Sequence, residues 1–291
     1  MKLWVVSTLK DSPGTELVIK AAKQAGHDVR RLHPLKVGMW VGKDPSLGYM
    51  EDGRFLEPPD LIFTRMGAAA PIRAFLVLRI ALHLPVPVIN HPDALMIARN
   101  KVLTGQVLAG VGLPVPDTLI LGEEQGSAEV LAALGEGPWV LKEAVGSKGA
   151  GVFLISDAEE LDRRLKEVPE SGGGWLVQRF LADAGGADIR VFLINGEARA
   201  AMKRQGKPGD FRSNLHLGGQ GTPYELDAEL REISERAARA IGLDTAGVDV
   251  VVTRDGYKIL EVNGSPGFSG ITGALGRNLA GELIEHLESL V

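Results

Sequence analysis

The sequence predicts an α/β fold that takes on α+β character after its first third. Short apolar runs alternate there with stretches of helical spacing, and this alternation indicates a small parallel sheet. Later strand-like runs follow one another across short turns, which favours antiparallel pairing. The dipeptide Asn195-Gly196, set between two apolar-rich runs, is the strongest of these turn signals.

The first part of the chain should contain three strands and two helices. Gly26 closes the first helix, whose apolar positions recur at helical spacing. No GxGxxG motif follows the first strand, so a Rossmann nucleotide site is not expected there. The expected elements are strands at 3–7, 60–67 and 85–90 and helices at 15–25 and 72–83.

A single helix is expected after Pro92, which suits a first helical turn, and it should run to about Val111 and stop at Gly112. A second domain should begin near there. Its strands should form an antiparallel sheet, and Asp157 should cap a helix that precedes the last of them. These strands are expected at 138–144, 151–156 and 175–181.

The last part of the chain should combine an antiparallel sheet with helices. A helix is expected at 227–241, followed by a hairpin of strands 247–253 and 257–263. If Gly256 ends a three-residue loop, Thr253 faces Tyr257 and the register places Asp249 directly opposite Glu261.

Asp249, Glu261 and Asn263 should therefore converge on one face of this hairpin, because residues two apart on a strand point the same way. Their neighbours, such as Val248 and Val250, are apolar, so both faces should be largely buried. Buried like charges need a partner, and carboxylate and carboxamide oxygens suit a hard cation such as Mg²⁺, with Mn²⁺ as an alternative. A solvated polar face of the hairpin is the competing interpretation.

Composition excludes several classes of protein. The 291 residues include 32 Lys and Arg against 37 Asp and Glu, so the electrostatic footprint of a general nucleic-acid binder is missing. There is no Cys, which excludes disulfides, thiolate metal sites and a Cys nucleophile. A secretory signal and a run of ~20 apolar residues are both missing, so we expect a cytoplasmic protein without a membrane span.

A Mg²⁺ ion held by few carboxylates usually also binds substrate phosphates, which require cations and glycine-rich backbone. Lys142 leads into a glycine-rich stretch at 146–151, although such hairpin tips are common and the spacing is not that of a P-loop. Lys101 lies on the helix after Pro92, where an exposed lysine is the ordinary interpretation. Residues 209–219 form a polar loop that suits an anion or substrate lid, or a plain surface loop.

Taken in order, these motifs resemble the ATP-grasp superfamily and, within it, the RimK-like amino-acid ligases. ADIRVFLING, GDFRSNLHLGG, AGVDVV and LEVNGSPG follow the RimK-like pattern almost residue for residue. Weaker matches in NHPDALMIARNK and VLKEAVGSKGAGV extend the resemblance over most of the chain. It implies three domains, expected at 1–92, 93–176 and 177–291, with ATP held between two antiparallel sheets.

The resemblance also implies roles for individual residues. Two lysines would contact phosphates, a glycine-rich flap would cover them, a linker segment would read adenine, and Asp249, Glu261 and Asn263 would hold Mg²⁺. The residues implied in phosphate and acyl-phosphate chemistry are Arg190, Arg212 and Asn214. The nucleotide contacts implied are Lys101, Lys142, Gly146, Ser147, Gly149, Gly151, Gln178, Arg179, Phe180, Asp188, Arg212, Ser213 and Asn214.

The linker segment departs from the family pattern. RimK-like proteins commonly have Gln-Glu followed by an aromatic residue, whereas this chain has Gln178-Arg179-Phe180. The acidic contact is lost, but backbone groups can still read adenine. ATP therefore remains the expected nucleotide, and the exact nucleotide preference stays open.

The implied reaction joins a carboxylate to an amine through an acyl phosphate, with glutamate added to the C-terminus of a protein or peptide such as a ribosomal protein. A small molecule or an amino-acid carrier protein is the alternative acceptor. A phosphotransferase and an ATP-binding regulator are the alternatives outside ligases. The resemblance implies a homo-oligomer, dimer or tetramer. The candidates for meeting an acidic acceptor are Arg65, Arg73 and the stretch from Lys203 to Lys207, and for each of them an ordinary solvated surface is the favoured interpretation.

Overall fold

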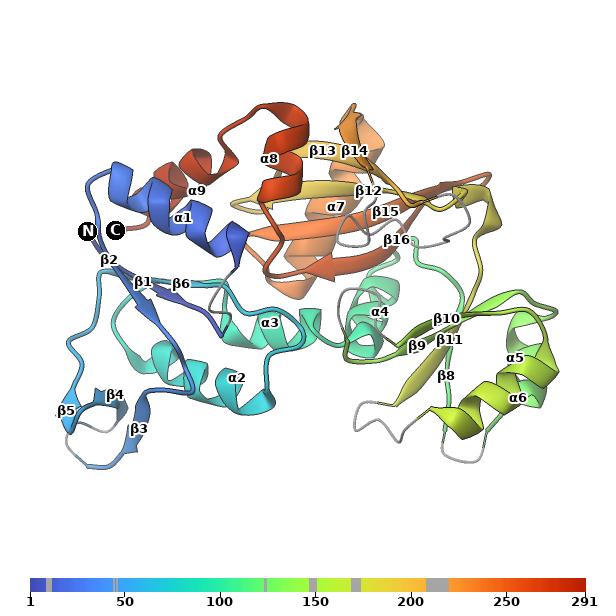
Figure 1. Ribbon diagram of the computed structural model, residues 1–291, viewed down its shortest axis with the longest axis horizontal. Coiled ribbons are helices and arrows are strands. Elements are labelled where there is room, and N and C mark those ends of the chain that lie inside the picture. The colour runs from blue at the N-terminus through green and yellow to red at the C-terminus, as the bar shows by residue number, and fades with distance from the viewer. Residues whose placement is uncertain are drawn as a thin grey trace.

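A computed structural model describes residues 1–8, 12–43, 45, 47–122, 125–146, 151–168, 174–207 and 220–291. The strands within these residues form four sheets, shown with their helices in Figure 1. The expected mixed α/β fold is confirmed. None of the helices in the described ranges is both long and apolar enough to cross a membrane.

The N-terminal sheet is parallel, as predicted, and has the strand order β2-β1-β6-β7. Its helices are α1 (Pro13–Gln24) and α2 (Ile72–Leu78), and α2 continues into the 3-10 helix η1 (Arg79–His83). Strand β2 was not predicted, because its sequence DVRRL occupies a sheet edge and lacks an apolar run. The strands are β1 (Lys2–Val6), β2 (Asp28–Leu32), β6 (Leu61–Thr64) and β7 (Val88–Ile89).

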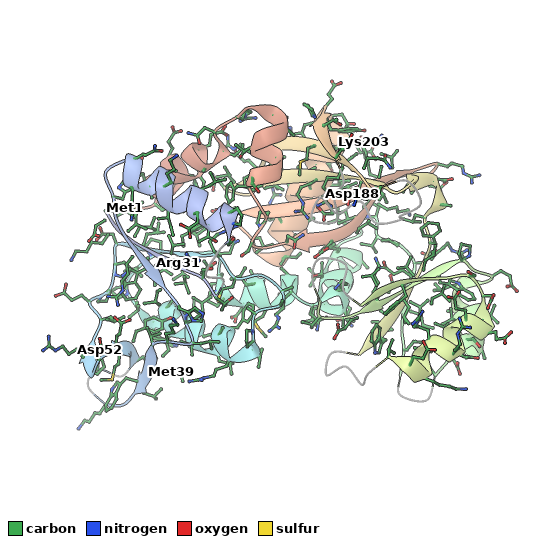
Figure 2. All side chains as sticks on the ribbon, viewed as in Figure 1. Met1, Arg31, Met39, Asp52, Asp188 and Lys203 are labelled. Carbon is green, nitrogen blue, oxygen red and sulfur yellow. The ribbon has the colours of Figure 1, made fainter. Side chains whose placement is uncertain are left out.

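A small antiparallel sheet between β2 and β6 was also not predicted. It consists of β3 (Gly38–Val41), β4 (Leu47–Glu51) and β5 (Arg54–Phe55). Figure 2 labels Met39 and Asp52 in this sheet, which projects from the N-terminal part of the molecule. The hydroxyl of Tyr49 donates to the carbonyls of Val77 (3.0 Å) and Leu78 (3.2 Å) and so fixes the sheet to α2.

The single helix expected after Pro92 is wrong, since the chain forms two helices, α3 (Pro92–Ala98) and α4 (Lys101–Gly110). The Asn100 side chain accepts from the backbone N–H of Val102 (2.9 Å) and Leu103 (3.3 Å), which makes it an N-cap and starts a new helix. Lys101 therefore begins α4, and its backbone N–H donates to the Ala144 carbonyl at 2.9 Å.

The central sheet is antiparallel, as predicted, with the order β10-β9-β11-β8. Two helices, α5 (Ser127–Leu134) and α6 (Ala158–Glu167), pack on one face around the buried side chain of Trp139. Asp157 caps α6 as expected, accepting from the Glu160 N–H at 2.9 Å. The strands are β8 (Thr118–Ile120), β9 (Trp139–Glu143), β10 (Val152–Ile155) and β11 (Trp175–Arg179).

The C-terminal sheet is antiparallel throughout and has the order β14-β13-β12-β15-β16. The predicted hairpin at Asn195-Gly196 is confirmed, and both residues have positive φ, 57° and 66°. Helix α7 (Ala228–Ile241) packs on one face. The strands are β12 (Ala187–Ile194), β13 (Glu197–Gln205), β14 (Gln220–Tyr224), β15 (Ala246–Thr253) and β16 (Gly256–Asn263).

The last hairpin reaches the predicted pairing by a different route. Its turn is one residue shorter than expected, because Thr253 pairs with Gly256 rather than with Tyr257. A register shift between Asp249 and Val250 then inserts one extra residue into β16, and Asp249 still lies opposite Glu261. The bulge thus compensates for the shorter turn.

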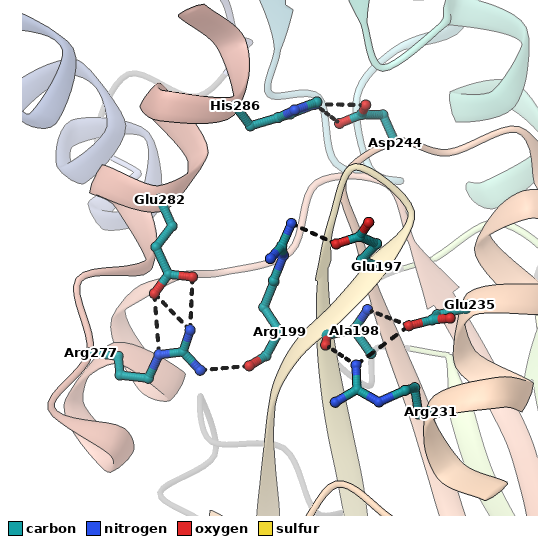
Figure 3. Close-up of polar contacts among 9 residues, drawn as sticks. All are labelled: Glu197, Ala198, Arg199, Arg231, Glu235, Asp244, Arg277, Glu282 and His286. Carbon is teal, nitrogen blue, oxygen red and sulfur yellow. Dashed lines mark hydrogen bonds and ion pairs between the residues drawn. The ribbon is translucent and has the colours of Figure 1, made fainter. Parts of the chain in front are cut away.

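The chain ends by returning to the N-terminal sheet. Helices α8 (Ser269–Leu275) and α9 (Leu279–Glu288) follow β16, and Leu283 of α9 joins the buried cluster that contains Leu3 and Val18. Polar contacts drawn in Figure 3 hold this region in place. Arg277 donates to the Arg199 carbonyl (2.6 Å) and pairs with Glu282, and His286 contacts Asp244 (2.9 Å).

The Asn90 carboxamide joins the N-terminal sheet to the C-terminal sheet. It is 1% exposed and donates to the carbonyls of Thr245 (2.7 Å) and Gly264 (2.8 Å). Its oxygen accepts from the backbone N–H of Asp244 (2.8 Å) and Thr245 (2.9 Å). Four main-chain groups therefore depend on one side chain, and three of these hydrogen bonds are buried, including the one to the carbonyl of the residue after Asn263.

We expect Asn90→Ala to lower the free energy of unfolding by about 3 kcal/mol or more, because it leaves buried main-chain donors and acceptors unpaired. Urea unfolding measures the change. Asn278→Ala is the matched control, since that carboxamide caps α9 through the Gly281 N–H and should cost only about 1 kcal/mol. Equal losses in the two variants would contradict the junction role of Asn90.

Candidate active site

One face of the C-terminal sheet carries a row of charged side chains. The register places Asp188 opposite Arg204, Arg190 opposite Asp249, and Asp249 opposite Glu261, so the row crosses β13, β12, β15 and β16. Asp188, Arg204 and Asp249 are each at most 6% exposed. A solvated polar face of the hairpin is therefore excluded for Asp249.

Asp249 is held by two arginines. Arg190 Nε donates to its Oδ1 at 2.6 Å, and Arg204 Nη2 lies 2.8 Å from its Oδ2. Burial favours the protonated carboxyl, but the charges of Arg190 and Arg204 outweigh burial and lower the pKa of Asp249. Arg204 also makes a bidentate pair with Asp188, with its Nε 2.6 Å from Oδ1. Asp188, an implied nucleotide contact, thus serves here to hold Arg204.

Glu261 stands in a different electrostatic position from Asp249. Burial, and then the neighbouring charge of Asp249, raise its pKa, while Lys101, Arg190 and Lys142 act in the opposite direction. The Asn263 carboxamide, oriented to satisfy its neighbours, donates to Glu261 Oε1 (3.3 Å) and accepts from Arg190 (3.0 Å). A cation bound beside Glu261 would stabilise its ionised form, because the pKa of this carboxyl is raised next to a second carboxylate.

The three predicted metal ligands do lie together, but not as a cluster of three acids. Within the described residues there is no group of three or more His, Asp or Glu side chains that could hold a metal ion. Asp249 already shares its charge with two arginines, so Glu261 offers the carboxylate oxygens that fit a Mg²⁺ ion best, and the Asn263 oxygen, which accepts from Arg190, lies beside it. The residues present fit this group with Glu261 as its principal acidic ligand.

Two lysines from α4 and β9 lie within electrostatic reach of Glu261. Lys142 Nζ donates to Gln178 Oε1 at 2.6 Å, and Lys101 Nζ donates to the carbonyls of Glu143 (3.1 Å) and Gly146 (3.4 Å). Burial, together with the charge of Lys101, lowers the pKa of Lys142 to about 8. Burial likewise lowers the pKa of Lys101. Burial thus disfavours the charge of both lysines, and Lys101 further weakens that of Lys142, so a bound anion such as a phosphate group would stabilise the protonated form of each.

The linker segment presents its side chains to both faces of the central sheet. Gln178 lies on the face of Lys142 and also donates to Thr118 Oγ1 at 2.9 Å. Arg179 donates instead to the Leu134 carbonyl at the end of α5, on the opposite face, and approaches Asp117 at 3.9 Å. The departure at Arg179 thus places a cation at a helix C-terminus, where it is favourable, and leaves only its backbone on the lysine side.

Some predicted site residues lie outside the described residues. These are Ser147, Gly149, Arg212, Ser213 and Asn214. At the ends of the glycine-rich stretch, the Gly146 carbonyl accepts from Lys101, and Gly151 has a φ of 67° and its carbonyl accepts from the Glu143 N–H.

Arg204 is the residue that reading the sequence missed. The Asn195-Gly196 turn alone would pair Asp188 with Lys203, but a bulge between Phe192 and Leu193 moves the register by one residue to Arg204. Lys203 is exposed whereas Asp188 and Arg204 are buried. Figure 2 labels Lys203 and Asp188 on the C-terminal sheet. Alternation along β13 is the signal that could have separated the two, because Ala200 and Met202 share the buried face of Arg204.

A family model described as a RimK-like ATP-grasp domain matches residues 98–287. The chain belongs to the RimK-like ATP-grasp family. It is 36% identical to a protein named probable alpha-L-glutamate ligase from Xanthomonas oryzae pv. oryzae (strain MAFF 311018), across 100% of this chain and 98% of that protein.

Two solved structures show the same fold. The ATP-grasp ligase PsnB, complexed with a phosphomimetic variant of a minimal precursor, Mg and ADP, has a TM-score of 0.75 at 22% identity, covering 99% of this chain and 98% of that one. A RimK domain ATP-grasp protein from Sphaerobacter thermophilus DSM 20745 has a TM-score of 0.71 at 22% identity, covering 98% and 99%. The ATP-grasp fold expected from the motifs is confirmed.

We expect Arg204→Leu to lower the free energy of unfolding by about 3–5 kcal/mol, because two buried carboxylates lose their shared partner. Arg199→Leu, on the same strand, removes a largely exposed pair with Glu197 and should cost less than about 1 kcal/mol. Chemical denaturation of both variants at pH 7 makes the comparison. A loss in Arg204→Leu no larger than in Arg199→Leu would show that the buried row does not depend on Arg204.

Proposed function

We propose that this RimK-like ATP-grasp protein is an ADP-forming ligase that joins the amine of glutamate to a carboxylate at the C-terminus of a peptide or protein. The observation that carries the proposal is the pairing of two oppositely charged faces. Lys101 and Lys142 lie within electrostatic reach of Glu261, the acid at the end of the charged row, and the lysines and Glu261 perturb one another's pKa values. Phosphates and a divalent cation, bound together, would neutralise both faces.

The reaction requires two displacements. A carboxylate oxygen of the acceptor attacks the γ-phosphorus of ATP, the bond from that phosphorus to the β–γ bridging oxygen breaks, and ADP leaves. The amine then attacks the acyl carbon, the bond from that carbon to the phosphate oxygen breaks, and phosphate and one proton are released. No covalent bond to the protein is needed, which agrees with the absence of Cys from the chain.

The protein's own residues position charge for these steps. Lys142 is held by Gln178 and Lys101 by two carbonyls, and we assign both lysines to binding phosphate oxygens. Glu261 and Asn263 would hold Mg²⁺, which supplies neutralisation of the phosphate charge. Arg190 lies between Asp249 and Asn263, so its guanidinium stays fixed at the edge of this site. Mn²⁺ is a second metal to test.

The choice of substrates rests on similarity to other proteins. The relatives similar to this chain over its whole length are named probable alpha-L-glutamate ligases, which supports glutamate as the amine. Solved structures with the same fold hold precursor peptides, which supports a peptide or protein as the acceptor. A ribosomal protein, a cytoplasmic location and a homo-oligomer are parts of the same proposal. We also propose that the chain consists of three domains, at 1–92, 93–176 and 177–291.

Mass spectrometry of the protein incubated with ATP, Mg²⁺, the twenty amino acids and a ribosomal protein fraction tests the function. A mass increase equal to whole glutamyl residues on one protein, with matching ADP release, is the expected result. ADP release without any shifted protein would move the acceptor to a small molecule. ADP release that depends on no amino acid would replace the ligase with a phosphotransferase.

Glu261→Gln should reduce Mg²⁺-dependent ADP release by about 100-fold or more, because it removes the principal acidic oxygen offered to the ion. Glu197→Gln is the control, since that carboxylate is exposed at the far end of β13. A coupled assay for ADP across a Mg²⁺ titration gives both values. Turnover by Glu261→Gln at the rate of the control would refute the metal assignment.

ADP affinity should fall as the pH rises through about 8. Lys142 carries its charge below its lowered pKa of about 8 and loses it above, whereas an ordinary lysine would stay charged to a much higher pH. Calorimetric titration of ADP between pH 7 and pH 9.5 measures the change. In Lys142→Arg the decline should be absent, because the guanidinium stays charged over this range. The same decline in both proteins would assign it to another group.

A further inference from the structure

Arg65 is a buried cation in the N-terminal part of the chain, directly after β6. It is 5% exposed, so the expectation of an ordinary solvated surface is wrong for this residue. Its Nη1 donates to the Pro266 carbonyl at 2.9 Å, and its guanidinium lies 5.1 Å from the ring centre of Phe268. Burial lowers its pKa to about 10. These partners bring no negative charge, and the arginine stays protonated at neutral pH.

Arg65 has no counter-ion among the described residues. No Asp or Glu in those ranges pairs with it, and its buried Nε has no hydrogen-bond partner there. Glu16, the acidic residue in the first turn of α1, pairs with Arg31. A buried charge without a partner costs several kcal/mol, in the order-of-magnitude range of ionic desolvation, so an anion is the expected complement.

The N-terminus of α1 adds a second positive pole beside this guanidinium. A Cβ atom on Gly14, in the first turn of the helix, would lie 2.9 Å from Arg65 Nη2. The helix has 12 residues, and its N-cap Ser12 makes no side-chain capping hydrogen bond. The positive end of a helix dipole and a guanidinium repel each other unless an anion lies between or beside them.

The surroundings of Arg65 and Gly14 are called the Arg65 junction. The segment after β16 connects this junction to the proposed ligase site. Pro266, which accepts from Arg65, lies three residues after Asn263 in the chain, and Ser265 between them has a buried hydroxyl with no partner in the described structure. The junction also lies at the carboxyl ends of the parallel strands β1 and β6, since Arg65 directly follows β6. That edge is where open α/β sheets bind their ligands.

Arg99 shows what a purely structural arginine looks like in the same protein. It donates to the carbonyls of Ala68 (3.1 Å) and Ala70 (3.0 Å), lies 4.5 Å from the ring centre of Phe75, and also has an unpaired Nε. It caps the C-terminus of α3, where the helix dipole favours a cation. Arg65 has similar neutral contacts but lies at the N-terminus of a helix, where the dipole disfavours a cation. Neutral contacts alone would therefore leave the charge of Arg65 in an unfavourable environment.

We propose that Arg65, with the N-terminus of α1, binds a carboxylate of the amino acid whose amine enters the amide. This inference rests on the proposed ligase function. The acceptor's carboxylate loses its free charge when it becomes an acyl phosphate, whereas the incoming amino acid keeps its carboxylates until the amide has formed. A permanent buried cation therefore matches the second substrate. Arg65 is in this role a specificity residue that contacts the substrate away from the reacting atoms.

Calorimetry in the presence of Mg²⁺ and ADP tests the proposal on the full-length protein. Arg65→Gln should weaken glutamate binding by at least about tenfold, the loss expected for a hydrogen bond to a charged group, and leave the affinity for ADP unchanged. Arg99→Gln is the control, because it removes an arginine with similar neutral contacts, and it should bind glutamate like the wild type. Equal glutamate affinity in wild type and Arg65→Gln, or equal losses in the two variants, would overturn the proposal.

The wild-type protein provides a test that does not depend on how the variant folds. Glutamine lacks the γ-carboxylate and isoglutamine lacks the α-carboxylate, so the one that binds at least about tenfold more weakly than glutamate identifies the group that Arg65 binds. Undiminished binding of both amides would overturn the proposal. If another amino acid binds in place of glutamate, the glutamate assignment fails, and the Arg65 proposal stands or falls on whether Arg65→Gln weakens that ligand.

Discussion

The structure of the site depends on one buried carboxamide. Asn90 hydrogen-bonds four main-chain groups near the start of β15 and the end of β16, and it does so from the end of the N-terminal sheet. Because one of these groups belongs to Gly264, the position of Asn263 and of the following segment is set by a residue in another sheet. The Pro266 carbonyl, which Arg65 uses, lies two residues further on. The positions of the candidate active site and of the segment that Arg65 contacts thus depend on the hydrogen bonds of one side chain that is buried away from solvent.

The site itself consists of two halves that are each electrostatically incomplete. On the side of α4 and β9, burial lowers the pKa of Lys101 and Lys142, and on β16, burial and Asp249 raise the pKa of Glu261. Asp249 keeps its negative charge although it is buried, because Arg190 and Arg204 already pair with it. Folding stability alone would not favour charges that are removed from water and only partly paired. Such uncompensated charge is typical of sites whose missing partners are ligands, and phosphates with a divalent cation are the ligands that we propose.

The sequence predicted the architecture and the pairing of Asp249 with Glu261, and much of this prediction depends on short-range patterns. Apolar runs, the Asn195-Gly196 turn and the Asp157 cap each act through neighbours in the chain. What it missed depends on longer-range geometry. Two bulges shift the registers of β12 and β16, and they decide that Arg204 pairs with Asp188 and that Asp249 still faces Glu261 after a shorter turn. The break before Lys101 could have been predicted, since Asn100 is a strong N-cap residue, but the continuous apolar pattern concealed it.

Arg65 lies outside the part of the chain that matches the family model, and this bears on the specificity for the amino-acid substrate. The RimK-like ATP-grasp model begins at residue 98, so the lysines, the linker segment and the carboxylate row all fall within it, whereas Arg65 and α1 fall outside. Chemistry shared by a family needs the same nucleotide and metal groups in each member, but the amino acid to be joined can differ. A recognition group for that amino acid is therefore best placed in the part of the chain that can vary without disturbing phosphate transfer. Arg65 meets this requirement, because among the described residues its link to the charged row runs through the segment after Asn263, where it contacts Pro266 and Phe268.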